Sequence, residues 1–130
     1  MGEITDCCQT LDNHGDECVR HGFTSENGGF YVVLDKNDEI IGQSWAWLGR
    51  KGELVLDSLE TLGTRINAEQ WTNIAESFVQ AIATSAPEIN ALHIGRGGET
   101  PDLKYEEKAA KPKDYKGYRD SKNQYRVWKR

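Results

Sequence analysis

The chain has 130 residues, of which 28% are charged and 37% hydrophobic, and its formal net charge is −5. That length suffices for one domain with a single core. No apolar run approaches the length that spans a bilayer, and the first residues do not resemble a signal peptide, so we expect a cytoplasmic protein that does not contact a membrane. Three cysteines do not suit a secreted disulfide framework, because such frameworks use an even number.

Residues 1–28 form an N-terminal segment with a cluster of cysteine and histidine. Thiolates and imidazoles at short spacing are what a tetrahedral zinc site needs, and the candidate ligands are Cys8, His14, Cys18 and His21. Their spacing follows no common zinc pattern. The alternative is that the cysteines are small buried side chains and the histidines lie on a surface loop. Cys18 lacks a clear third group that would orient it as a nucleophile.

Three antiparallel strands are predicted next, at about residues 30–34, 39–48 and 53–60. Each is rich in branched and aromatic residues, and turn-forming residues separate the first two. In the middle strand, alternation places Trp45 and Trp47 on one face and the small residues Ser44 and Ala46 on the other. We therefore expect a meander with one bulky face.

The clearest helix of the sequence is predicted at about residues 68–85. Asn67 and Gln70 have the spacing of a capping box, and apolar residues from Trp71 to Ile82 recur at helical spacing. A buried strand follows at about residues 91–95, so that strand, helix and strand form a crossover. This order predicts parallel pairing of residues 53–60 with residues 91–95.

A short helix beginning at Thr100-Pro101 and reaching about residue 110, and a final strand at about residues 124–128, complete the prediction. The expected fold is α+β, with a mixed, mainly antiparallel sheet. We expect His93, in the strand at residues 91–95, to be a core residue. The glycines of residues 95–98 are able to bring amide groups to an anion, but a glycine-rich turn alone is weak support for a ligand site.

The C-terminal part is basic. From Lys104 to Arg130 there are ten Lys or Arg and four Asp or Glu residues, whereas the rest of the chain is acidic. Tyrosines and Trp128 alternate with these basic residues, which is a pattern that stacks nucleic-acid bases. Because acids interrupt the pattern and the body is acidic, we expect that nucleic acid is not the partner.

The order of elements over residues 29–130, together with the strand sequences at residues 41–47 and 54–60, resembles the GNAT superfamily of acyl-CoA-dependent N-acetyltransferases. The resemblance implies a GNAT-like domain at residues 29–130 and acetyl-CoA as cosubstrate. It implies that the loop before the long helix cradles the CoA pyrophosphate with backbone amides. The matching residues here are Leu62, Gly63, Thr64, Arg65, Ile66 and Asn67.

The resemblance also implies catalytic roles. Glu60 matches the position from which a carboxylate removes the amine proton, with Asp57 in reserve, and Tyr105 or Tyr118 would protonate the departing thiolate. The strand backbone around Leu59 and Glu60 would bind the thioester carbonyl. Residues 1–28 have no match to the family's first strand and first two helices, which usually form part of the acceptor groove.

The expected function is acetyl transfer to an amine of a small molecule or protein. The alternative is a non-catalytic GNAT-like module that recognises a protein or nucleic-acid partner, with zinc stabilising its N-terminal segment. The sequence leaves the oligomeric state open, a dimer included.

Overall fold

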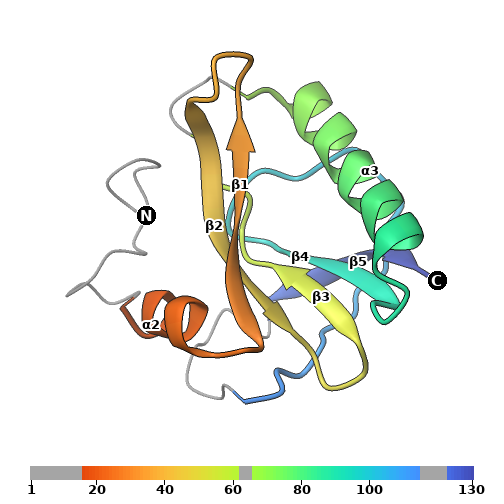
Figure 1. The fold of residues 1–130 in the computed structure, drawn as a ribbon. Coiled ribbons are helices and arrows are strands. Elements are labelled where there is room, and N and C mark those ends of the chain that lie inside the picture. The colour runs from red at the N-terminus through yellow and green to blue at the C-terminus, as the bar shows by residue number, and fades with distance from the viewer. Residues whose placement is uncertain (1–15, 62–65, 115–122) are drawn as a thin grey trace.

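The computed structural model describes residues 16–61, 66–114 and 123–130, with side chains described from residue 20 onward. Two helices and five strands lie in this part of the chain (Figure 1). In chain order they are α2 (Asp16–Thr24), β1 (Gly28–Leu34), β2 (Ile40–Leu48), β3 (Glu53–Leu56), α3 (Ala68–Ser85), β4 (Ala91–Gly95) and β5 (Gln124–Lys129). None of the helices in the described ranges is long and apolar enough to cross a membrane.

The five strands form one mixed sheet in the order β1-β2-β3-β4-β5. Strands β1, β2 and β3 pair antiparallel, and β4 and β5 do so as well. Strands β3 and β4 are parallel, with Glu53 opposite Ala91 and Leu56 opposite Ile94. The predicted α+β class, the meander and the parallel crossover are therefore confirmed.

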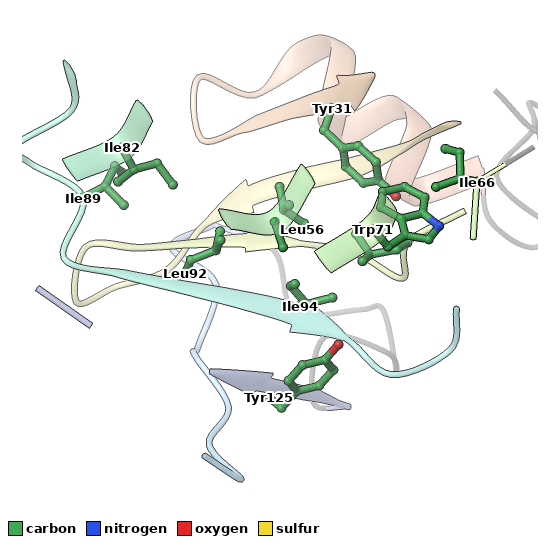
Figure 2. Close-up of a cluster of buried hydrophobic side chains, with 11 residues drawn as sticks. Tyr31, Leu56, Ile66, Trp71, Ile82, Ile89, Leu92, Ile94 and Tyr125 are labelled. Carbon is green, nitrogen blue, oxygen red and sulfur yellow. The ribbon is translucent and has the colours of Figure 1, made fainter. Parts of the chain in front are cut away.

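Side chains are buried on both faces of the sheet. On one face, Leu56, Leu92 and Ile94 pack with Trp71 and other residues of α3 (Figure 2). On the opposite face, Trp45, Trp47, Val55 and Ala110 form a second cluster, against which Phe30 packs. Helix α2 lies on this second face, where the ring of His21 meets the ring of Trp45 edge-on at 5.4 Å. The molecule thus has a sheet between two unequal layers, α3 on one side and α2 on the other (Figure 1).

Helix α3 begins as its sequence predicts. The Asn67 side chain accepts a hydrogen bond from Gln70 N, and the Gln70 side chain accepts one from Asn67 N, each at 2.8 Å. Both bonds satisfy amides that the first turn of a helix leaves without partners, which stabilises this end.

The predicted helix at residues 101–110 is wrong. The segment is irregular, and Glu106 forms a β-bridge with Arg126 of β5. Backbone bonds of 2.9 Å run in both directions between these two residues. The helix-start signal at Thr100-Pro101 reflects local sequence only. The backbone groups of this segment form hydrogen bonds with the edge of β5 in place of helical hydrogen bonds.

Two strand boundaries and part of the N-terminal segment also differ from the prediction. Strand β1 begins at Gly28, before the predicted start at residue 30, and residues 16–24 form a helix, where a surface loop carrying the histidines was the alternative to a metal site. Strand β3 ends at Leu56, four residues before the predicted end. After Leu56 the chain stays beside β2, where Asp57 N donates to Trp45 O and Thr61 forms an isolated bridge with Gly42, and this segment forms the candidate site.

Candidate functional site

The only parallel pair in the described sheet, β3 and β4, ends at Leu56 and Gly95. Ligands of proteins with parallel strands bind outside the carboxyl ends of those strands, where neighbouring chain segments diverge. Three carboxylates lie here. Asp57 and Glu60 follow β3, and Glu99 follows β4. The sequence predicted Asp57 and Glu60 at this place, and the topology adds Glu99.

Glu60 has the properties of a general base for neutral pH. Burial, with smaller contributions from the charges of Asp57 and Glu99, raises its pKa from 4.5 to about 7. Each cause disfavours the ionised form, because a buried carboxylate loses hydration and is repelled by like charges. A carboxyl group with this pKa exists in both protonation states near neutrality, which is what efficient proton removal requires.

Tyr31 supports this site, and the sequence reasoning missed it. Its hydroxyl donates a hydrogen bond to Ser58 O at 3.1 Å and accepts one from Glu60 N at 3.0 Å. Tyr31 is 4% exposed and lies on β1, two strands away from β3. A signal did exist, because alternation turns Tyr31 inward and a buried tyrosine needs a partner for its hydroxyl. The identity of that partner depends on strand order.

The turn after β4 packs directly on the segment after β3. Glu99 N donates to Leu59 O at 3.0 Å, and Gly97 N donates to Ser58 Oγ at 2.9 Å. A Cβ added to Gly98 would overlap the Leu59 carbonyl, so this approach requires glycine. Of the backbone that the resemblance assigned to the thioester carbonyl, the Leu59 carbonyl accepts from Glu99 N and the Glu60 amide donates to the Tyr31 hydroxyl, so both are already bonded within the chain.

The expected pyrophosphate loop is described only at its end. Leu62, Gly63, Thr64 and Arg65 lie outside the described residues. Ile66 is 4% exposed and belongs to the core, and Asn67 is the N-cap of α3. Both described side chains of this loop therefore have a structural role, Ile66 in the core and Asn67 at the start of α3.

Of the two tyrosines predicted as acids, only Tyr105 lies in the described part of the chain. Tyr105 is half exposed and packs edge-on against Tyr125 at 5.1 Å, with the Arg96 guanidinium 5.8 Å from its ring centre. Tyr105 thereby belongs to the β5 side of the sheet. Tyr118 lies outside the described residues.

Of the predicted zinc ligands, only His21 has a described side chain. Trp45 Nε1 donates to His21 Nδ1 at 3.1 Å, and His21 Nε2 lies 2.7 Å from Asp114 Oδ1. Because Nδ1 is the acceptor, Nε2 carries the proton and donates to Asp114. Cys8 and His14 lie outside the described residues, as does the Cys18 side chain. Within the described part, no three metal-binding side chains gather.

Comparison of the chain with protein-family profiles, with curated proteins and with solved structures finds no match.

Proposed function

We propose that this protein is a GNAT-like N-acetyltransferase that uses acetyl-CoA and in which Glu60 is the general base. The observation that carries the proposal is the position of Glu60. It lies at the carboxyl ends of the parallel pair β3 and β4, and its pKa is about 7. Near pH 7 its two protonation states are about equally populated, so the proton that it takes from one amine is readily released afterwards.

The reaction follows from these groups. The lone pair of the acceptor amine attacks the thioester carbonyl, and the amine proton passes to the Glu60 carboxylate directly or through a water. The carbon–sulfur bond then breaks, the amide forms and CoA leaves as its thiolate, which takes a proton from Tyr105, Tyr118 or water. Asp57 and Glu99 are positioning groups, because their charges help to raise the Glu60 pKa.

A second candidate is the non-catalytic binding module. The hydrogen bond from Glu60 N to the Tyr31 hydroxyl favours it, because it occupies an amide that the thioester carbonyl was expected to use. The two candidates differ in whether acetyl-CoA binds at all.

The test begins with thermal unfolding of the full chain at several acetyl-CoA concentrations. Acetyl-CoA at about 100 times its Kd is expected to stabilise the folded protein by roughly 2.7 kcal/mol. Acetylation of a panel of amines, followed by release of the CoA thiol, then measures turnover. Glu60→Gln should retain the thermal shift and lose at least about 100-fold in kcat.

The matched control is Glu76→Gln, which removes an exposed carboxylate from α3. It should leave both readouts unchanged. No thermal shift with acetyl-CoA at millimolar concentration would contradict the enzyme and favour the binding module. A normal shift with full activity in Glu60→Gln would contradict the role of Glu60 alone.

A further inference from the structure

An irregular strap, residues 106–114, crosses the second face of the sheet, the face that carries Trp45 and Trp47. Its first residue, Glu106, is bridged to β5, and its last, Asp114, binds His21 of α2 (Figure 1). Between these two residues the strap forms neither a helix nor a strand, and the side chains from residue 107 to residue 109 are exposed. Segments of this kind open at a lower free energy than the sheet on which they lie.

The centre of the strap is held by one buried residue. Ala110 is 3% exposed and packs in the cluster of Trp45, Trp47 and Val55. The Gln124 side chain of β5 accepts a hydrogen bond from Ala110 N at 3.0 Å and donates one to Ala110 O at 3.3 Å. A small apolar side chain and this pair of bonds thus close the strap over the sheet.

His93 lies on the sheet face that the strap covers. It is on β4 opposite Val55, and it is 1% exposed, as expected of a core residue. The backbone of Lys108, in the strap, is close enough to its ring to influence its pKa. Nevertheless, neither ring nitrogen of His93 has a hydrogen-bond partner in the described part of the chain. Buried polar atoms nearly always have partners, so this ring is held in the fold without the contacts that would stabilise a charge.

The closed strap favours the neutral form of His93. Burial is the largest effect and lowers the pKa of His93 below its ordinary value of 6.5. The charged groups that act on the ring in the described chain are Glu53 of β3, which raises this pKa, and Arg126 of β5, which lowers it. The Gln124 side chain and the Lys108 backbone also raise it, but burial outweighs all of these contributions. A lifted strap admits water to the ring, which then regains its ordinary affinity for a proton.

We propose that protonation of His93 opens the strap at residues 106–114, so that mildly acidic pH exposes the cluster of Trp45, Trp47 and Val55. Above pH 6.5 the ring is neutral in both forms, and the strap stays closed. As the pH falls below 6.5, the open form binds a proton that the closed form does not accommodate, so the closed form loses stability. This device is separate from the proposed acetyl transfer, because Glu60 follows β3 and takes no part in it.

Amide hydrogen exchange of the full chain at pH 7.5 and pH 5.5 tests the proposal, once rates are corrected for the intrinsic pH dependence of exchange. With a pKa of 6.5, the ring in the open form is protonated in about 10% of molecules at pH 7.5 and about 90% at pH 5.5. The opening constant of residues 106–114 should therefore be at least about fivefold larger at pH 5.5. Helix α3, on the other face, should show no such increase.

Two variants assign the effect to His93. His93→Leu keeps an apolar side chain at this position and removes the titrating group, so the opening constant of the strap should no longer depend on pH. Lys108→Leu, which changes an exposed side chain of the strap itself, should keep the dependence. A wild-type strap that opens equally at both pH values, or a His93→Leu strap that responds as the wild type does, overturns the proposal.

The wild type alone gives a second measurement, which holds even if His93→Leu fails to fold. Nuclear magnetic resonance of the imidazole nitrogens follows the protonation of His93 directly. The ring should titrate below pH 6.5, together with the loss of protection in the strap. A ring that becomes charged while the strap keeps its full protection overturns the proposal.

Discussion

The raised pKa of Glu60 has a consequence for stability as well as for chemistry. Because its folded pKa of about 7 exceeds its ordinary value of 4.5, the folded protein binds this proton more tightly than the unfolded chain does. Stability therefore falls as the pH rises from 4.5 to 7 and stays lower above 7. Glu60→Gln removes this cost and should be more stable than the wild type by about 1–3 kcal/mol at pH 8.

Urea unfolding at pH 5 and at pH 8 measures this effect. The difference between Glu60→Gln and the wild type should be large at pH 8 and small at pH 5. Glu76→Gln should show no such dependence. If catalysis uses Glu60, the same variant gains stability and loses activity, which is the trade-off expected of a functional residue. Equal stability of the two proteins at pH 8 would contradict the assigned electrostatics.

Arg130 closes the far end of α3. Its guanidinium donates to four carbonyls, Ile82 O, Ala83 O, Ala86 O and Ile89 O, at 3.0–3.2 Å. The last carbonyls of a helix lack partners in the helix itself, and a cation there also complements the helix dipole. Arg130→Ala should destabilise the protein by about 1–2 kcal/mol.

Arg130→Lys should recover only part of this loss, since a single ammonium does not reproduce the planar fork of donors. Lys129→Ala removes the same charge from the neighbouring exposed residue and should have little effect. Chemical denaturation of the three variants makes the comparison. A fully stable Arg130→Ala protein would show that water replaces the guanidinium at no cost.

These residues also show which contacts a sequence predicts. Asn67 and Gln70 are three residues apart, so their capping box follows from local spacing alone. Arg130 lies more than forty residues from the carbonyls that it binds, and Tyr31 lies 27 residues from Ser58. Contacts of this kind depend on the strand order, which periodicity does not give.

At the scale of elements, Asp114 fastens α2 to the chain that precedes β5. Its carboxylate accepts from His21 Nε2 at 2.7 Å, from Asn27 Nδ2 at 3.3 Å and from Ser25 Oγ. These bonds, that from His21 first, lower the Asp114 pKa to about 2. The stability that they supply is present above the ordinary pKa of 3.8 and is lost as the pH falls through 2.

Asp114→Asn should therefore loosen α2. We expect amide hydrogen exchange in Asp16–Thr24 to become at least about tenfold faster at pH 7, with α3 unchanged, because local opening of α2 leaves the α3 face of the sheet intact. Asp102→Asn, an exposed carboxylate elsewhere, is the control. Below about pH 2 the variant and the wild type should converge. Uniform acceleration across both helices would contradict a local role.

The helices and strands were predicted with unequal accuracy, and the cause is physical. Helix α3 is long and has one continuous apolar stripe, so its type and both ends follow from the sequence. The segment at residues 101–110 has a start signal but no such stripe, and pairing of Glu106 with Arg126 decides its conformation. Strand β3 stops at Leu56, and the chain after it forms only isolated bridges, Leu59 with Glu99 and Thr61 with Gly42.

At the scale of the whole molecule, the sheet topology could be predicted from the sequence, but the candidate site could be predicted only in part. Three strands, a long helix and a further strand leave few arrangements once crossover rules apply, and the parallel pairing of β3 with β4 is one of them. The same rules place the carboxyl ends of β3 and β4 side by side, and Glu60 follows β3. They do not specify how the turn after β4 packs, and that turn covers Leu59.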